Sequence, residues 1–231
     1  MNTLQVEEPD ANNYQILKDK SANLKTSFFL QSFDIVPLIM YSVDNSTFRA
    51  FHQSQGYVKT YKPSSIFRVW AYNFLTKNIE VIKSKENFES LRSIALEELE
   101  NFWKSEDRGT PKFYQLNKLI DLFFKALPLW NKLDIETKEW IFNNTNVPLD
   151  KFSLALLRKW SSELEIHENA SMNFINEKNY DEFQKAIKDI CKSIDIPVIV
   201  FDLFAWNESH KPKESFKLIE LDKKKQKTIL S

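Results

Sequence analysis

Hydrophobic residues recur at helical spacing along most of the chain after residue 63. Over residues 64–82 an apolar stripe is formed by Ile66, Phe67, Trp70, Ala71, Phe74, Leu75 and Ile82. Spacings of three and four residues put these side chains on one face of a helix, which is typical of a helix packed against a core. The pattern therefore predicts a helix whose N-cap is Ser64 or Ser65.

The same spacing predicts further helices over residues 86–104, 112–127, 135–143, 148–164 and 180–194. Capping and stop signals mark several of their ends. Asp134 is predicted to cap one helix, and Asn179 with Glu182 resembles the capping box of another. Pro128 is expected to stop the helix that begins near Lys112, because proline cannot donate the hydrogen bond of a helix interior.

Three other segments complete the predicted fold. A short helix is expected over residues 14–24. Residues 27–43 alternate poorly and are expected to form one or two short strands or buried irregular segments, whereas residues 196–206 suit either a buried strand or a last core helix. The fold class is therefore predicted as mainly α, a compact multi-helix domain with a small β element in the N-terminal quarter.

The polar start and the charged end of the chain suggest its domain organisation. Residues 1–12 are predicted to be disordered, and residues 13–63 to form a mixed segment packed on the core. Residues 64–207 are predicted to make the helical core domain. Residues 208–231, which include Lys223-Lys224-Lys225, are predicted to be a charged tail.

The composition predicts a large aromatic core and excludes some functional classes. The 231 residues include 19 Phe, 7 Tyr and 6 Trp but only 2 Gly. Each buried ring removes about 150–250 Å² from water, so a substantial core is expected. Two glycines are too few for the glycine-rich loops of P-loop and Rossmann nucleotide sites.

Charge and cysteine content narrow the candidate partners. With 32 basic and 32 acidic residues, the chain shows no general attraction for nucleic acid, although a local basic face is compatible with this balance. One cysteine and three distant histidines predict neither a disulfide nor a metal site, and no cofactor is expected. Without a signal peptide or an uninterrupted apolar run, the protein is expected to be cytoplasmic with no membrane partner.

The main candidate for chemistry is Asp150, which follows Pro148 and Leu149 at the predicted start of a helix. An aspartate in this position commonly serves as an N-cap, where its side chain contributes about 0.5–2 kcal/mol by accepting a backbone N–H. Such a carboxylate is also held rigidly enough to stabilise a positive centre or activate water. The two interpretations are compatible, because a capping carboxylate has a second oxygen.

Four stretches carry a resemblance to known proteins: residues 108–111 (Arg-Gly-Thr-Pro), 117–125, 148–150 (Pro-Leu-Asp) and 196–206. Their order is similar to an uncharacterised group of bacterial proteins and, more distantly, resembles the helix-hairpin-helix DNA glycosylase superfamily. The resemblance implies that Asp150 matches the catalytic aspartate, and that Lys112 or Lys118 matches the lysine that attacks the sugar. The paired hairpin glycines of that superfamily are absent here, and the interval from either lysine to Asp150 is longer.

The resemblance further implies an enzyme that acts on double-stranded DNA and turns its target base into an aromatic pocket. Phosphate contacts are expected from Arg108, Lys112 and Lys151. The base pocket is expected to contain Trp70, Tyr114, Trp206 and Asp202, although core packing is the alternative for each ring. Asp202 is expected either at a surface position of an otherwise buried helix or in the pocket, where it would orient Lys118.

The alternative function is a non-enzymatic protein-interaction component of a phage-defence or toxin–antitoxin-like system. Balanced charge, the missing glycines and the lack of a cofactor motif favour this alternative. The two functions predict different surfaces. A glycosylase requires a basic groove and a pocket of base size beside Asp150, whereas an interaction protein requires an exposed apolar patch, with Asp150 only capping its helix.

Overall fold

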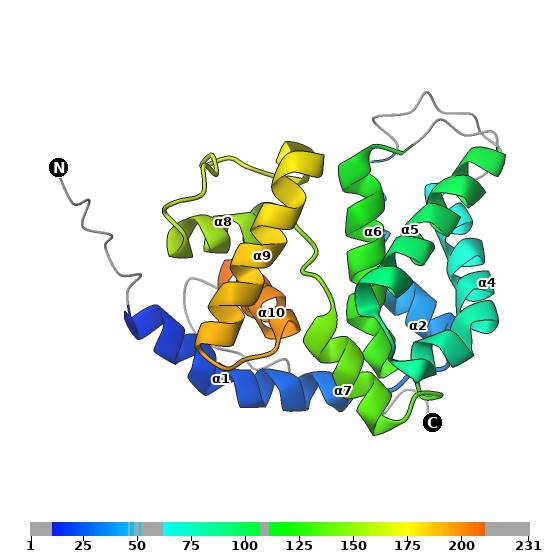
Figure 1. Ribbon diagram of the computed structural model, residues 1–231, viewed down its shortest axis with the longest axis horizontal. Coiled ribbons are helices and arrows are strands. Elements are labelled where there is room, and N and C mark those ends of the chain that lie inside the picture. Colours follow the sequence, from blue (N-terminus) through cyan, green and yellow to red (C-terminus); the bar gives the residue numbers. More distant parts are fainter. Residues whose placement is uncertain (1–10, 46, 49–50, 52–61, 107–110, 211–231) are drawn as a thin grey trace, which may run out of the picture.

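Helices form almost all of the regular structure in the computed structural model, which describes residues 11–45, 47–48, 51, 62–106 and 111–210 (Figure 1). The α-helices in these residues are α1 (Ala11–Phe29), α2 (Ile35–Ser42), α4 (Pro63–Ser84), α5 (Phe88–Ser105), α6 (Phe113–Ala126), α7 (Ile135–Asn144), α8 (Lys151–Trp160), α9 (Glu177–Ser193) and α10 (Val198–Ser209). Two short 3-10 helices are η1 (Leu127–Leu129) and η2 (Met172–Phe174). The prediction of a mainly α fold is confirmed.

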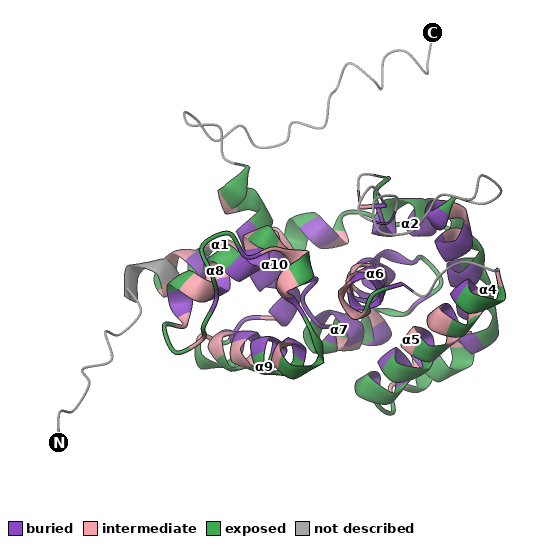
Figure 2. Cartoon of the chain, turned by 90° about the horizontal axis from the view of Figure 1, so that it is seen from above, coloured by how far each residue is buried: buried purple, intermediate pink, exposed green. Residues whose placement is uncertain are grey.

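Helix α6 lies between two groups of helices. On one side α4 packs against α5, α2 packs against α4 and α6, and α5 packs against α6. On the other side α10 packs against α1, α7, α8 and α9. Figure 1 shows the two groups on the right and on the left, with α1 running along the bottom of the left-hand group. In the view from above, α6 is surrounded and largely buried (Figure 2).

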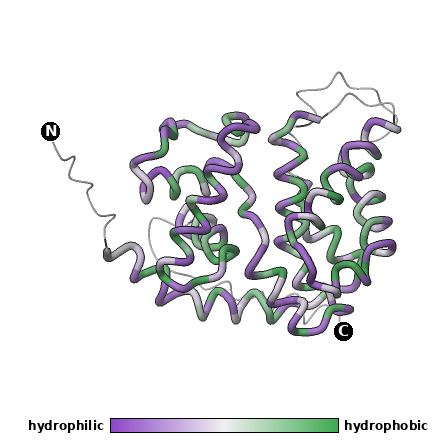
Figure 3. Tube along the Cα trace, viewed as in Figure 1, coloured by the Kyte–Doolittle hydropathy of each residue, from purple (hydrophilic) through white to green (hydrophobic). Residues whose placement is uncertain are grey.

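The predicted apolar faces form the core. All of the apolar residues predicted for the helix after residue 63 are buried in α4. Rings of α4 and α6 pack edge to face, with the centroid of Phe123 at 5.2 Å from that of Trp70 and 5.9 Å from that of Phe74. Such pairs contribute about 0.5–1.5 kcal/mol each beyond the area that they bury. Figure 3 shows hydrophilic and hydrophobic positions interleaved along most helices, as expected where one face is buried.

The expectation of short strands within residues 27–43 is wrong. In the described residues the only β contact is an isolated bridge, and Ile35–Ser42 forms α2. Pro37 is compatible with this helix because it lies in the first turn, where backbone N–H groups lack a partner within the helix. Leu38 is buried and Met40 is exposed. Packing of α2 against α4 and α6 therefore outweighs the strand preference of its Ile and Val residues.

Several other boundaries differ from the prediction or decide between alternatives. Lys62 is the N-cap residue of α4, so the assignment of that cap to Ser64 or Ser65 is wrong. α8 (Lys151–Trp160) is shorter than the helix predicted over residues 148–164. α1 (Ala11–Phe29) is longer than the expected short helix. The capping pair of Asn179 and Glu182 is wrong, because Asn176 caps α9: Oδ1 of Asn176 accepts the backbone N–H of Asn179 at 3.3 Å, and Oδ1 of Asn179 accepts that of Asn176 at 2.9 Å. Residues 196–206, left open between strand and helix, belong mostly to α10.

Some predictions concern residues outside the described ones, namely those for residues 1–10, for Arg108 and for the chain after residue 210. Residues 11–12, predicted as disordered, begin α1. Residues 208–209, predicted as part of the charged tail, end α10. None of the described helices is both long enough and apolar enough to cross a membrane.

Candidate active site

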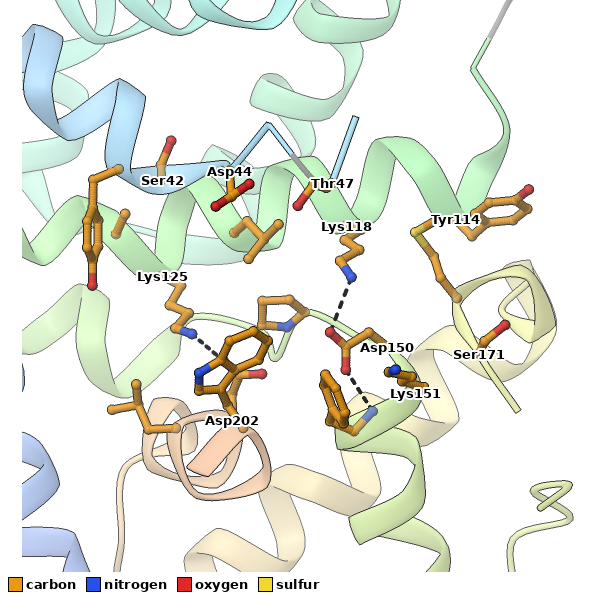
Figure 4. A pocket seen from close by; sticks show the side chains of 18 of the residues that line it. Ser42, Asp44, Thr47, Tyr114, Lys118, Lys125, Asp150, Lys151, Ser171 and Asp202 are labelled. Atoms are coloured by element: carbon orange, nitrogen blue, oxygen red, sulfur yellow. Dashed lines mark hydrogen bonds and ion pairs between the residues drawn. The ribbon is translucent and has the colours of Figure 1, made fainter. Parts of the chain in front are cut away.

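A cavity of about 970 Å³ opens between α6 on one side and α8 and α10 on the other (Figure 4). Small-molecule pockets typically measure about 300–1,000 Å³, so a single nucleoside fits within this volume. The residues that line the cavity include most of those predicted for a site: Lys112, Tyr114, Lys118, Asp150, Lys151, Asp202 and Trp206. The C-terminal end of α2 and the 3-10 helix η2 complete its walls.

Lys118 and Asp150 form a pair in the wall of this cavity. The Nζ of Lys118, on α6, donates a hydrogen bond to Oδ2 of Asp150 at 3.2 Å (Figure 4). Their side chains are 17% and 22% exposed, so a ligand in the cavity can reach both. The structure therefore brings together an amine and a carboxylate that lie 32 positions apart in the sequence.

Asp150 is also the N-cap of α8. Its Oδ1 accepts the backbone N–H groups of Phe152 at 2.9 Å and Ser153 at 3.3 Å. The Oγ of Ser153 accepts the backbone N–H of Asp150 at 2.8 Å, which completes a capping box. The predicted N-cap is confirmed. Because one oxygen holds the helix and the other faces Lys118, the cap fixes the carboxylate in the cavity wall.

A second lysine–aspartate pair lines the same cavity. Lys125 lies two turns after Lys118 on α6, and its amine forms an ion pair with the carboxylate of Asp202 on α10 (Figure 4). Burial raises the pKa of the Asp202 carboxyl, although Lys125 opposes this effect. Burial lowers the pKa of the Lys125 amine, but the Asp202 carboxylate outweighs burial and the pKa lies above its ordinary value. This pair is therefore a fixed donor and acceptor in the wall.

Asp202 was expected either at a surface position or in the pocket, and the surface position is wrong. The residue is 8% exposed, so it does not occupy a surface position. Its hydrogen-bond partner is Lys125 rather than Lys118. Asp202 is thus a pocket carboxylate, but it does not orient Lys118 by a direct hydrogen bond.

The predicted aromatic residues fall into two classes. Tyr114 and Trp206 line the cavity, and Trp206 is 51% exposed. Its ring packs edge to face with Phe152 at 5.5 Å between centroids. Trp70 does not belong to the pocket: it is buried in α4 against Phe123, so its assignment to the base pocket is wrong. The alternative of core packing holds for Trp70.

Both lysines predicted to contact phosphates lie at the cavity. Lys112 is the N-cap residue of α6, and Lys151 is the first residue of α8. Both are exposed, and the amine of Lys151 lies 4.6 Å from the centroid of the Phe152 ring. Both amines are thus at the rim of the cavity, where the phosphate backbone of DNA can approach. Arg108 lies outside the described residues.

Lys125 is the main site residue that sequence reasoning missed. A signal for it exists, because a spacing of seven from Lys118 puts both amines on the same face of a helix. Tyr41 and Asp44 also line the cavity, from the end of α2 and just after it. They were missed because their segment was predicted to contain strands, which gave no basis for placing it beside α6.

No group of three or more His, Cys, Asp or Glu residues in the described part of the chain could hold a metal ion. Comparisons with known proteins found no family model, no curated protein and no solved structure that matches this chain.

Proposed function

We propose that the protein is a DNA glycosylase that excises a damaged or modified base through Lys118 and Asp150. The observation that carries this proposal is the 3.2 Å contact between the Lys118 amine and the Asp150 carboxylate in the wall of a cavity of about 970 Å³. An accessible amine beside a fixed carboxylate is an arrangement suited to covalent catalysis at a sugar carbon. The resemblance of residues 148–150 to the catalytic segment of helix-hairpin-helix glycosylases points the same way.

The proposed reaction begins with a base turned out of the duplex into the cavity. The bond between C1′ of the sugar and the base nitrogen breaks, and its electron pair leaves with the base. Asp150 stabilises the positive charge that develops on the sugar, because its carboxylate is already fixed beside it. Either a water molecule or Lys118 then attacks C1′. If Lys118 attacks, its ammonium first gives one proton to the departing base, so that Asp150 stays ionised. After the N–C1′ bond has formed, the C1′–O4′ bond breaks, O4′ takes a second proton from the nitrogen, and an imine remains between Lys118 and C1′.

The remaining cavity residues suit recognition of a base. The exposed ring of Trp206 offers a face for stacking, and base–aromatic stacking contributes about 1–3 kcal/mol. Lys125 and Asp202 present a donor and an acceptor to the edge of the base, and this pair would reject a base with the wrong exocyclic groups. Tyr114 lies on the wall nearer to the N-terminus of α6.

The charge of the cavity is compatible with DNA despite the neutral chain. Its lining contains four lysines (Lys112, Lys118, Lys125 and Lys151) and three aspartates (Asp44, Asp150 and Asp202). Within the site, Asp150 and Asp202 are paired with lysines, so the amines of Lys112 and Lys151 at the rim are left for phosphate contacts. Binding is therefore expected to be modest and to weaken with salt, because few counterions are released.

The test is base excision on a panel of duplexes that carry uracil, an oxidised purine, an alkylated purine or an abasic site, together with phage DNA that contains modified bases. Alkali reveals abasic sites, and borohydride traps an imine between the protein and the DNA. We expect the wild type to cleave at least one substrate. Asp150→Asn should abolish excision while keeping the helix cap, since asparagine caps as well as aspartate. Lys118→Gln should abolish trapping if the amine is the nucleophile.

Lys77→Gln is the matched control, because Lys77 lies on α4 outside the cavity and forms an exposed ion pair with Glu98. This variant should match the wild type. If the wild type neither cleaves nor binds any duplex at low salt, the proposed function is wrong and Asp150 is only a helix cap. If Asp150→Asn and the wild type excise equally, the assignment of this site is wrong.

The alternative function, a protein-interaction component, is supported by exposed apolar side chains on α2 and α4. Val36 and Met40 lie one helical turn apart on α2, and Val69 and Tyr72 are exposed on α4. Scattered apolar residues are common on protein surfaces, so they carry less weight than a built cavity. If no duplex is cleaved or bound, these exposed side chains are the expected contact with a protein partner.

A further inference from the structure

The segment that leads to Asp150 is buried, from Thr145 to Leu149. Buried backbone N–H and C=O groups require partners, and an irregular segment cannot supply them internally. A single side chain from α9 meets this need at Val147. Oε1 of Gln184 accepts the Val147 N–H at 3.0 Å, and Nε2 of Gln184 donates to the Val147 carbonyl at 2.8 Å. Gln184 is itself 3% exposed, so water does not compete for these bonds.

One turn earlier on α9, Tyr180 holds the neighbouring residue. Its hydroxyl accepts a hydrogen bond from Nδ2 of Asn146 at 3.2 Å and donates one to Oδ2 of Asp121 at 2.7 Å. Asp121 lies on α6, three residues after Lys118. Tyr180 therefore links the segment before Asp150 to the helix that carries Lys118.

An Arg92 side chain from α5 completes the link on the α6 side. Its Nη2 donates to Oδ1 of Asp121 at 2.9 Å, to Oδ1 of Asn117 at 2.6 Å and to the Tyr180 hydroxyl at 2.5 Å. Arg92 and Asp121 are 7% and 1% exposed. Buried charges that satisfy each other in this way specify one arrangement of the three helices, because any shift leaves a charge unpaired.

We propose that Tyr180 and Gln184 are positioning residues that hold Asp150 opposite Lys118. Neither residue lines the cavity, so any effect on a ligand acts through Asp150. Only Pro148 and Leu149 lie between Val147 and Asp150, and the fixed φ of proline makes this connection stiff. A displacement of Val147 is therefore passed on to the Asp150 carboxylate.

The expected effect on excision rests on the proposed glycosylase function. The positioning of Asp150 opposite Lys118 does not depend on that function. A misplacement of about 1 Å at a reacting group can cost on the order of 10²-fold in rate. Loss of the two Gln184 hydrogen bonds is expected to slow excision by that order. It should also release the Lys118 amine from Asp150, which is measurable without DNA.

The first test is therefore the acylation rate of Lys118 by a small anhydride, followed by peptide mass spectrometry on the folded protein. The variants are Gln184→Met, which keeps the side-chain size but removes both hydrogen bonds, and Asp150→Asn, which removes the partner carboxylate. We expect the rate at Lys118 to rise in Gln184→Met towards the rate in Asp150→Asn. Cys191→Ala is the matched control: Cys191 is buried two turns later on α9 and should leave the rate unchanged.

A second test uses the pH profile of Gln184→Glu. A protonated glutamic acid can still accept from Val147 N–H and donate to the Val147 carbonyl, whereas the ionised form repels that carbonyl. The excision rate of this variant, divided by the wild-type rate at the same pH, should rise as pH falls from about 8 to about 5, because burial raises the pKa of a carboxyl. A purely structural effect on folding gives a flat ratio for the folded protein.

The outcomes separate the two proposals. Unchanged Lys118 acylation in Gln184→Met overturns the positioning role, whether or not the wild type cleaves DNA. Altered acylation in a protein that neither cleaves nor binds any duplex supports the positioning role and overturns the proposed function. A Gln184→Glu ratio that is independent of pH also overturns the positioning role.

Discussion

At the scale of single residues, Asp150 shows how one side chain can serve both the fold and the site. Oδ1 accepts two backbone N–H groups of α8, while Oδ2 accepts the Lys118 amine. The first interaction removes most of the rotational freedom of the carboxylate. The second interaction places the amine of Lys118 beside the fixed carboxylate. A capping role is therefore evidence of rigidity at this position and does not argue against catalysis.

The two tryptophans assigned together from the sequence should respond in opposite ways to truncation. Trp70→Ala is expected to cost about 3–5 kcal/mol of unfolding free energy, because a ring buried against Phe123 is lost from the core. Trp206→Ala should leave the unfolding free energy within about 0.5 kcal/mol, because the ring is exposed. It should lower the single-turnover excision rate about 5- to 150-fold through lost stacking. Urea unfolding and excision assays on both variants check this, and equal effects on stability would contradict it.

These two rings mark the limit of prediction from sequence at this scale. Trp70 lies on an amphipathic segment, where its neighbours at helical spacing, Ile66 and Phe74, indicate a core position. Trp206 ends an almost wholly apolar segment, which gives no such indication of its exposure. Asp150 was identified from a proline-led helix start, which is a local feature, and Lys118 from the resemblance to the glycosylase superfamily. Their approach to 3.2 Å depends on how α6 and α8 meet, and no local pattern contains that information.

At the scale of elements, some helix starts were predicted correctly and others were not. Asp134 was predicted to cap α7, and its Oδ1 accepts the backbone N–H of Thr137 at 2.8 Å. The cap of α9 was assigned three residues too late, because Glu182 follows Asn179 by three residues as in a capping box, whereas the residue at that position of the true box is Asn179 itself. Helix type was less predictable for α2, where burial against two other helices outweighs the preference of β-branched residues.

Capping by Asp134 predicts a dependence of stability on acid pH. The hydrogen bond from the Thr137 N–H is the largest cause that holds the pKa of the Asp134 carboxyl below its ordinary value of 3.8. A carboxyl whose pKa is lower in the folded state stabilises the fold above its unfolded pKa and loses that contribution as pH falls through its folded pKa. Asp134→Asn keeps the cap but cannot titrate. The stability advantage of the wild type over this variant should therefore disappear below about pH 3.8, and only there.

Urea unfolding at several pH values measures this difference, and an NMR titration of the Asp134 carboxyl gives its pKa directly. Asn87 caps α5 with a neutral side chain and provides an internal comparison, because its hydrogen bond to the Ser90 N–H does not titrate. An Asp134 pKa at or above 3.8 would contradict the assigned role of the Thr137 hydrogen bond.

At the scale of the whole molecule, the buried cluster of Arg92, Asp121 and Tyr180 joins the two groups of helices around α6. Arg92 and Tyr180 lie 29 and 59 positions from Asp121 in the sequence, so no motif could have revealed the cluster. Burial lowers the pKa of Arg92, but the Asp121 carboxylate outweighs it and the pKa lies above its ordinary value. The arginine therefore stays charged, and the stability of the interface between the two groups of helices depends on the Asp121 carboxylate.

Removing either Arg92 or Asp121 alone should lower the unfolding free energy more than removing both. Arg92→Met leaves the Asp121 carboxylate buried without its cation, and Asp121→Leu leaves the guanidinium without its anion, so each is expected to cost about 3–5 kcal/mol of unfolding free energy. The double variant buries two apolar side chains instead and should cost much less than the sum, with a coupling of about 2 kcal/mol or more. Urea unfolding of the four proteins gives the coupling directly, and additive effects would contradict a buried ion pair.

The same four proteins test how the interface reaches the site. Tyr180 keeps its hydrogen bond from Asn146 in the double variant but loses its contacts to Arg92 and Asp121. If the link between α6 and α9 fixes the distance between Lys118 and Asp150, acylation of Lys118 should be faster in the double variant even where its stability is close to that of the wild type. If acylation instead follows unfolding free energy across the four proteins, the cluster contributes only to stability.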